Sequence, residues 1–205
     1  MPAHLWDYEP DHLEATVSEL LVATATSSDA LVDESVREVL HELREHLRMD
    51  VMFLSEISGG RRTFKHVDAA PGSEVVKTGG SSPLEESFCQ CVLDGRLPGL
   101  VNDVPRHPNF DQLPKTPFRV GAHLSAPVVL SDGRVYGTLC AFSFAGDESL
   151  TGRDYEKLAT VARTTAKRID QRRQRVNDEE MAGWQLEPIE PGKAASAWDK
   201  RGRNA

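Results

Sequence analysis

Two alternating segments around Asp132-Gly133 constrain the fold of this chain more than any other feature. Every second residue from Val120 to Leu130 is apolar, which is the period-two pattern of a strand with one buried face. An Asp-Gly pair directly after such a segment predicts a tight hairpin turn, with Gly133 at positive φ. The returning strand is expected over residues 135–144. Antiparallel sheet is therefore the centre of the predicted fold.

A second hairpin is expected earlier in the chain. Residues 49–57 and 62–68 have the pattern of strands, and Gly59-Gly60 between them supplies the turn. Residues 69–82 are mostly small or flexible, which predicts a loop that covers a pocket. A short helix is expected from Leu84, because the proline before it suits the first helical turn.

Apolar residues at spacings of three and four predict three amphipathic helices. The first covers Leu13–Thr24, and the second runs from about Ala30 to Leu47 with Asp29 as its N-cap. The third carries a heptad seam from Tyr155 to Val176. We expect the first and third helices to pack against the same elements of a second copy, which would make a homodimer.

These elements divide the chain into three expected parts. Residues 1–28 form an N-terminal helical extension, and residues 29–176 form one folded domain that includes the C-terminal helix. The remaining residues, 177–205, are expected to be a disordered tail, because their Pro, Gly, Ala and charged residues lack apolar periodicity.

Composition excludes several classes of protein. The net charge of -8 argues against binding to nucleic acid, and the basic residues within 167–175 are interpreted as an exposed helix face. The chain shows neither a signal peptide nor an apolar segment long enough for a membrane span. Its 3 cysteines, an odd number, do not form a disulfide framework, which predicts a protein of the reducing cytoplasm.

Cys89 is the residue to which the sequence allows the most different roles. A thiol near a helix N-terminus feels the positive end of the helix dipole and ionises more easily. Cys91 lies two residues further on, which in a helix puts the two thiols on roughly opposite faces and argues against a shared metal site. Cysteine is also among the residues most often buried. Core packing, redox or ligand sensing, and thiolate catalysis all stay open for Cys89.

The order of the segments resembles a GAF domain of the bacterial sensory type. The likeness rests on Pro83–Val92, then Leu97–Val104, then the hairpin 120–144, and it covers about residues 30–175. The resemblance implies an α+β fold with a central antiparallel sheet of five to six strands. The terminal helices would lie on one face of that sheet, and loops would enclose a pocket on the other.

The same resemblance implies a non-enzymatic sensory or regulatory module. Such a module would bind a small molecule or sense redox state, and would signal through a protein effector or a dimer. Some GAF domains attach a bilin through a cysteine followed by histidine, but here Gln90 follows Cys89. Others are free methionine-(R)-sulfoxide reductases with a cysteine ahead of the fourth strand, and residues 110–120 hold none. A thiol-dependent enzyme of this kind is the alternative function.

Polar side chains on the less apolar face of the hairpin predict a small-ligand pocket. Asp103, at the end of a short strand, would cap a turn or anchor a ligand. Alternatively to binding a ligand, the polar side chains of the hairpin form hydrogen bonds to the backbone of the loops over the sheet. The predicted ligand-binding residues are Phe88, Cys89, Asp103, His123, Ser125, Tyr136, Thr138 and Cys140. No catalytic residue or metal ligand is assigned, and the sequence identifies no cofactor.

Overall fold

The computed structural model of this 205-residue chain describes residues 29–184, with side chains from Val36 onward. The expected N-terminal helix and most of the expected tail therefore lie outside the described residues. The chain divides into two units, which end and begin at Asp170 and Gln171. The first unit holds the sheet and its covering helices.

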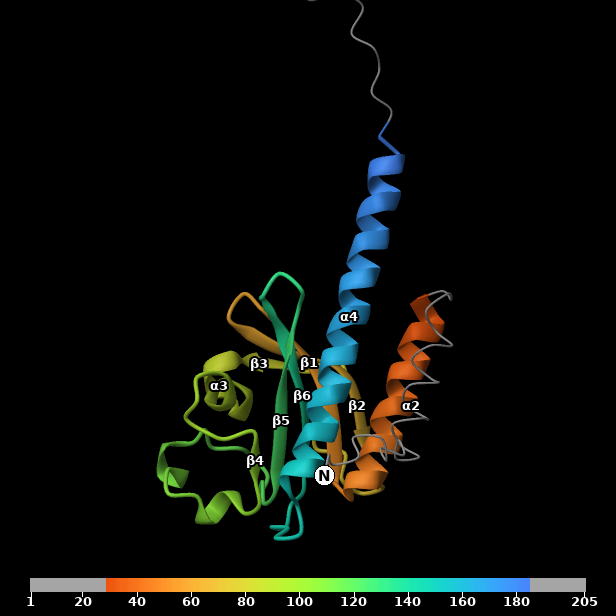
Figure 1. The fold of residues 1–205 in the computed structure, drawn as a ribbon. Coiled ribbons are helices and arrows are strands. Elements are labelled where there is room, and N and C mark those ends of the chain that lie inside the picture. The colour runs from red at the N-terminus through yellow and green to blue at the C-terminus, as the bar shows by residue number, and fades with distance from the viewer. Residues whose placement is uncertain (1–28, 185–205) are drawn as a thin grey trace, which may run out of the picture. The chain divides into compact units, whose positions relative to one another are not determined.

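Six strands form one antiparallel sheet (Figure 1). Their order across the sheet is β3-β2-β1-β6-β5-β4. The strands are β1 (Val51–Ser58), β2 (Arg61–Ala69), β3 (Ser81–Pro83), β4 (Leu100–Val101), β5 (His123–Val129) and β6 (Val135–Phe142). The α+β class and the antiparallel sheet predicted from the sequence are confirmed. Gly133 has φ +81°, so the positive-φ turn between β5 and β6 is confirmed as well.

Helices connect the strands and cover both faces. The described helices are α2 (Asp29–Leu47), α3 (Phe88–Leu93) and α4 (Gly152–Ala182), with short 3-10 helices η1 (Leu84–Glu86), η2 (Val104–Arg106) and η3 (Phe110–Gln112). The short helix expected from Leu84 is confirmed as the 3-10 helix η1, but it does not continue to Cys89. Ser87 has extended backbone at φ -125° and ψ 146°, so η1 ends there and α3 begins at Phe88.

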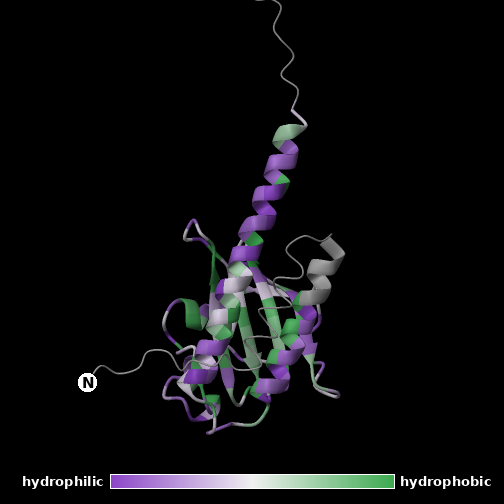
Figure 2. Cartoon of the chain, turned by 45° about the vertical axis from the view of Figure 1, so that its right-hand side comes forward, coloured by the Kyte–Doolittle hydropathy of each residue, from purple (hydrophilic) through white to green (hydrophobic). Residues whose placement is uncertain are grey.

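One face of the sheet packs against α2 and the part of α4 within the first unit (Figure 1). Figure 2 shows apolar residues along the strands beneath these helices. The buried residues of this core include Val39, Leu40 and Leu43 of α2, Leu158 and Ala162 of α4, and Leu124, Ala126 and Leu139 of the sheet. Burial of the valine and leucine side chains is the main stabilising term, at about 1.5–3 kcal/mol for each.

The other face of the sheet has its own apolar cluster. It contains Phe53, Phe64, Phe88, Val101, Val104, Leu113, Val120 and Phe142, together with the three cysteines. Because α3 and the loops around η2 and η3 cover this face, β5 is buried on both sides between His123 and Ala126. The expectation of one buried face for this strand was therefore wrong.

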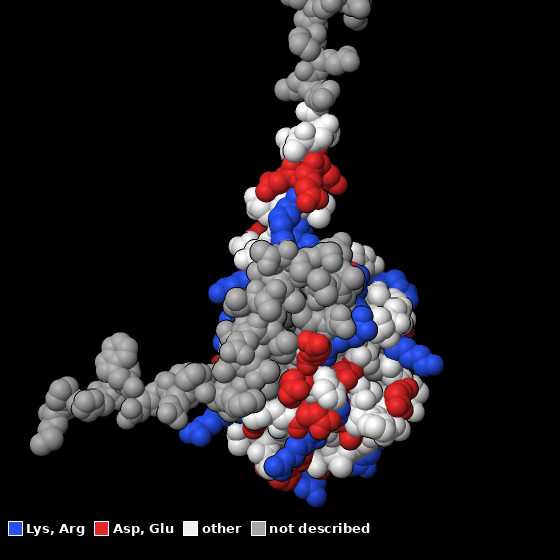
Figure 3. Space-filling view, turned by 90° about the vertical axis from the view of Figure 1, so that its right-hand side faces the viewer, with Lys and Arg blue, Asp and Glu red and all other residues white. Residues whose placement is uncertain are grey.

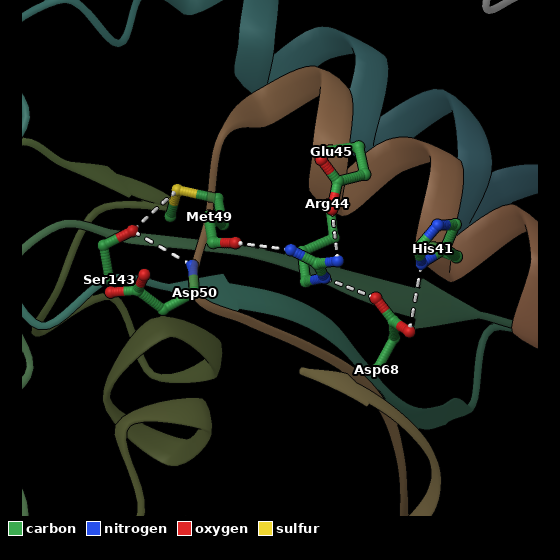
Figure 4. A network of polar contacts seen from close by, with 7 residues as sticks. All are labelled: His41, Arg44, Glu45, Met49, Asp50, Asp68 and Ser143. Carbon is green, nitrogen blue, oxygen red and sulfur yellow. Dashed lines mark hydrogen bonds and ion pairs between the residues drawn. The ribbon is translucent and has the colours of Figure 1, made fainter. Parts of the chain in front are cut away.

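A buried arginine fixes the end of α2 to the sheet (Figure 4). Arg44 is only 4% exposed, and its guanidinium donates to the carboxylate of Asp68 on β2. It also donates to the carbonyl of Met49 at 3.3 Å and forms an ion pair with Glu45 at 2.5 Å. Asp68 is 22% exposed and Glu45 is 59% exposed, so solvent partly screens both charges and the arginine's burial is what makes its partners matter. The network holds the end of β2 opposite to Arg62.

The last two positions of the expected heptad seam, Arg172 and Val176, lie in the second unit. Leu158, Ala162 and Thr165 are buried in the first unit, and Ile169 packs against its core, so the first five positions of the seam serve the domain itself. Residues 171–182 continue α4 past the boundary expected at Val176 and are all exposed. Figure 2 shows that this stretch is mainly hydrophilic.

No described helix is both long enough and apolar enough to cross a membrane. On the face drawn in Figure 3, Lys and Arg side chains are interspersed with Asp and Glu. The coloured, described residues of that face therefore show mixed charge and no continuous basic surface.

Candidate functional site

A cavity of about 520 Å³ lies on the face of the sheet that carries α3. We call it the α3 cavity. Its walls come from β1, β2, β6, α3 and the loop 112–118, and Glu85, Glu86 and Lys115 at its rim are exposed. Five phenylalanines supply most of the apolar wall, namely Phe53, Phe64, Phe88, Phe118 and Phe142. A volume and lining of this kind are typical of small-molecule sites.

The N-terminus of α3 places Cys89 on the cavity wall. Ser87 caps the helix, since its hydroxyl oxygen accepts from the backbone N–H of Gln90 at 3.3 Å. The same hydroxyl donates to the carbonyl of Leu84 at 2.6 Å, which joins η1 to α3. Phe88 and Cys89 then line the cavity, whereas Cys91 does not and is fully buried.

Cys89 contacts a second cysteine and an arginine. Its sulfur lies 3.7 Å from Sγ of Cys140 on β6 and 3.7 Å from Nη1 of Arg62 on β2. Behind Cys140, the hydroxyls of Ser125 and Thr138 lie 3.1 Å and 3.2 Å from its sulfur. The Cys89 thiol thus contacts both the guanidinium of Arg62 and the buried polar cluster around Cys140.

These contacts give the thiols different pKa values. The hydrogen bond from Cys140 lowers the pKa of Cys89, and the positive charge of Arg62 adds to this effect against the opposing effect of burial. Burial raises the pKa of Cys140, and its hydrogen bond to Cys89 raises it further. Burial also raises the pKa of Cys91. Cys89 is therefore the thiol that ionises first.

Arg62 is the main cation in the cavity wall. Its guanidinium carbon lies 4.5 Å from the ring centre of Phe64 and 5.9 Å from that of Phe53. One nitrogen donates to the hydroxyl of Ser82 at 3.0 Å. Nε is buried and has no hydrogen-bond partner among the described residues, and none of their carboxylates forms an ion pair with Arg62.

His123 adds a second unpartnered group. Its ring lies 5.5 Å from that of Phe88 and lines the cavity, and its side chain is almost fully buried. Burial, together with the charge of Arg62, lowers the pKa of His123 to about 4, so the ring is neutral at pH 7. Its Nδ1 atom is buried and has no partner in the described part of the chain.

The structure brings six of the eight predicted ligand-binding residues together. Phe88, Cys89 and His123 line the cavity. Ser125, Thr138 and Cys140 lie directly behind Cys89 and are fully buried, so they support the wall and do not form its surface. Whether any of the six binds a ligand stays a prediction.

Tyr136 and Asp103 lie elsewhere. Val128 pairs with Gly137 and Val129 with Val135, so Tyr136 is an extra residue in β6 and packs on the core beneath α2 and α4. The alternation expected from Tyr136 to Cys140 was wrong because of this bulge. Asp103 precedes η2 without a capping hydrogen bond, and its carboxylate pairs with Arg106 at 3.2 Å, away from the cavity.

The match to known families decides the identity of the fold. Residues 29–170 match the family model of the GAF domain. The chain belongs to the GAF domain family. No curated protein matches this sequence significantly.

Solved GAF structures have the same fold at low sequence identity. The GAF domain from an Acinetobacter phosphoenolpyruvate-protein phosphotransferase has a TM-score of 0.61 at 15% identity, over 87% of this chain and 100% of that chain. Free methionine-R-sulfoxide reductase from Neisseria meningitidis, solved with its substrate, has a TM-score of 0.59 at 18% identity, over 82% and 95%. A GAF domain from A. aeolicus in an inactive state has a TM-score of 0.56 at 17% identity, over 78% of this chain and 96% of that chain. These likenesses concern the fold alone.

Sequence reasoning missed the cation of this GAF domain. Arg62 lies two residues before Phe64 on the same strand, so period two puts both on one face of the sheet. An arginine two residues from an aromatic residue in a predicted strand was the sequence signal that could have identified this cation. The described residues contain no group of three or more His, Cys, Asp or Glu side chains placed to hold a metal ion.

Proposed function

We propose that this GAF domain is a non-enzymatic regulatory module that binds a small molecule with an apolar, ring-sized body and an acidic group. The observation that carries the proposal is the guanidinium of Arg62. Its Nε is buried beside the α3 cavity with no partner among the described residues. Buried donors are satisfied in nearly all proteins, so an unpartnered donor on a residue that lines a cavity calls for a ligand or water.

An anionic ligand matches this guanidinium best. Arginine presents a planar set of donors that binds carboxylates and phosphates, often through two bonds at once. The carboxylates nearest the cavity, Glu85 and Glu86, are exposed at its rim and form no ion pair with Arg62. The positive charge at the wall is therefore available to an incoming acid.

The walls favour an aromatic or otherwise flat body. The rings of Phe118 and Phe142 stack at 5.4 Å with 11° between their planes, and Phe53 meets Phe64 edge to face at 4.8 Å. Aromatic surfaces of this kind pack well against another ring. The neutral ring of His123 supplies one further hydrogen bond that would fix the ligand's orientation.

The signal would leave through a second copy of this chain or a separate effector protein. The described part of the second unit is one exposed helical stretch, in which Val176 is 47% exposed and Met181 is 61% exposed. Short helices gain most of their stability from packing, so a solvated helix of this kind is suited to a partner.

The test compares acid and amide probes of one shape. Phenylacetate and phenylacetamide are titrated into the wild-type protein by isothermal calorimetry at low salt. We expect the acid to bind at least about fivefold more tightly than the amide, and Arg62→Gln to abolish the difference. Arg96→Gln is the control, since Arg96 also lines the cavity but is already paired with Asp94 at 2.7 Å. Equal binding of acid and amide, or an effect of Arg96→Gln as large as that of Arg62→Gln, would contradict the proposal.

A thiol-dependent reductase is the second candidate, because Cys140 lies against Cys89 although the expected segment 110–120 has no cysteine. The likeness to the Neisseria reductase concerns the fold alone and leaves this candidate to experiment. Repeated turnover of free methionine-R-sulfoxide with dithiothreitol would support it over the binding module. Native mass spectrometry of the protein from its own host would identify a retained ligand and support the module instead.

A further inference from the structure

We propose that Cys89 and Cys140 are a peroxide-oxidisable dithiol, in which a small hydroperoxide in the α3 cavity oxidises Cys89 and Cys140 then closes a disulfide. The proposal goes beyond ligand binding and does not depend on it. It rests on three features: the distance between the sulfurs, the access of one sulfur to the cavity, and the cation beside it.

The two sulfurs are already in contact. Cys89 on α3 and Cys140 on β6 are separated by 51 residues in the chain, yet their Sγ atoms lie 3.7 Å apart. A disulfide bond measures about 2.05 Å, so the sulfurs must approach by roughly 1.7 Å. Both side chains are buried among neighbours that hold them toward each other.

Both cysteines are buried, at 1% and 0% exposure, and Cys89 is the one that borders the cavity. Cys89 lines the cavity, whereas Cys140 lies behind it and does not. The cavity opens among the exposed residues Glu85, Glu86 and Lys115, which gives a small neutral peroxide a route to Cys89. The geometry therefore assigns the attacking role to Cys89 and the resolving role to Cys140.

Arg62 supplies what the attack needs. The thiolate is the nucleophile in thiol oxidation, and the guanidinium 3.7 Å from Cys89 favours that form. The lowered pKa of Cys89 and the raised pKa of Cys140 agree with this order, because the resolving thiol keeps its proton until the second step.

The chemistry balances with one hydroperoxide. The Cys89 thiolate attacks the distal peroxide oxygen, the O–O bond breaks, and the leaving oxygen takes a proton as water or an alcohol. Cys89 becomes a sulfenic acid. The sulfur of Cys140 then attacks that of Cys89, the S–O bond breaks, and the hydroxide takes up the thiol proton and leaves as water. In total two thiols are oxidised to one disulfide and the peroxide is reduced.

Cys91 provides the internal control. It lies two residues from Cys89 but on the other side of α3, it does not line the cavity, and its thiol stays protonated because burial raises its pKa. If oxidation depended only on the presence of a thiol on this helix, Cys91 would react as well as Cys89.

The experiment is peptide mapping after treatment with hydrogen peroxide. In Cys91→Ala, we expect one equivalent of peroxide to remove both remaining thiols and lower the mass by about 2 Da. Tryptic peptides 78–96 and 135–153, which contain Cys89 and Cys140, should then appear as one species joined by a disulfide. Wild type should give the same cross-link with Cys91 still alkylatable. In Cys140→Ser, Cys89 should stop at the sulfenic acid and be trapped by dimedone.

Several results would overturn the proposal. They are the absence of the cross-link in both wild type and Cys91→Ala, a disulfide between two copies of the chain, or oxidation of Cys89 to the sulfinic acid with Cys140 intact. Because peptide mapping of wild type needs no substitution, a variant that fails to fold does not remove the test. Failure here would leave acid binding at Arg62 untouched, since that is measured in the reduced protein.

Discussion

Nη1 of Arg62 on β2 lies 3.7 Å from Sγ of Cys89 on α3, although the two residues are 27 apart in the chain. The guanidinium therefore faces two possible anions. One is the thiolate of Cys89, and the other is an acidic group that enters from solvent. We therefore predict that an acidic ligand and the Cys89 thiolate compete for Arg62.

Removing the cation should raise the pKa of Cys89. The pKa of this thiol is lowered to about 6. The hydrogen bond from Cys140 has the largest effect, and the charge of Arg62 adds to it. We predict that Arg62→Gln moves it upward by about one pH unit, because an opposite charge this close typically lowers an acid's pKa by one unit or more. The pH profile of alkylation by iodoacetamide, recorded in Cys91→Ala, measures the shift. A profile unchanged by Arg62→Gln but changed by Arg96→Gln would show that Arg62 has no such role.

Removing the thiolate should strengthen the binding of an acid. Cys89→Ser replaces the competing negative charge with a neutral hydroxyl, so we predict tighter binding of phenylacetate at pH 7.5, on the order of fivefold or about 1 kcal/mol. Titration calorimetry measures the affinity, and circular dichroism should remain native. Cys91→Ser, which does not touch the cavity, should bind as wild type does. Weaker binding by Cys89→Ser would mean that the thiol is a ligand contact and not a competitor.

His123 should make the protein less stable in mild acid. Its folded-state pKa is lowered to about 4, mainly by burial, whereas the unfolded value is about 6.5. Between these values the unfolded chain binds a proton that the folded chain does not, so the free energy of unfolding decreases as the pH falls. The contribution at pH 5 is about 2 kcal/mol.

Urea denaturation at pH 7 and pH 5 tests this prediction. His123→Gln should lose about 2 kcal/mol less than wild type over that interval, whatever its stability at pH 7. His46→Gln changes an exposed histidine and serves as the control. Equal losses in wild type and His123→Gln would show that His123 takes up its proton in the folded state.

Dimerisation can be tested in the second unit without disturbing the sheet. Ile169 packs on the domain's own core, so a charge there would unfold the domain and say nothing about assembly. Val176 is 47% exposed, and we predict that Val176→Asp shifts a homodimer to monomer in sedimentation velocity with thermal unfolding unchanged. Gln174→Asp adds the same charge at an exposed polar position and should leave the dimer intact. A wild-type monomer at tens of micromolar would refute the homodimer.

Local pattern predicted the hairpin, but not which side chains face the cavity. The alternation from Val120 to Leu130 and the Asp-Gly turn depend on neighbouring residues, and β5 and β6 form as expected. The bulge that places Tyr136 under the helices depends on pairing between two strands, which period two in one strand does not contain. A second register shift in the pairing of β1 with β2 likewise interrupts the alternation after Phe64.

The central contacts of the site join residues far apart in the chain. Cys89 and Cys140 are 51 residues apart, and Arg62 and Cys89 are 27 apart. The helix position of Cys89 left an activated thiol open beside core packing, but neither the cation nor the second sulfur could be found from spacing. Both were brought to Cys89 by the pairing of β2 and β6 with β1 and by the packing of α3 on the sheet.

The most direct test of the acid-binding cavity is the Nε–H signal of Arg62 in a heteronuclear NMR titration with phenylacetate. The signal is assigned by its loss in Arg62→Gln. Because Nε is buried and unpartnered among the described residues, we predict a saturable downfield shift of this signal as the carboxylate binds, with the signal of Arg96 unmoved and phenylacetamide without effect. An Arg62 signal that stays in place at saturating phenylacetate, or shifts equally with the amide, would contradict the assignment of Arg62 as the acid-binding group.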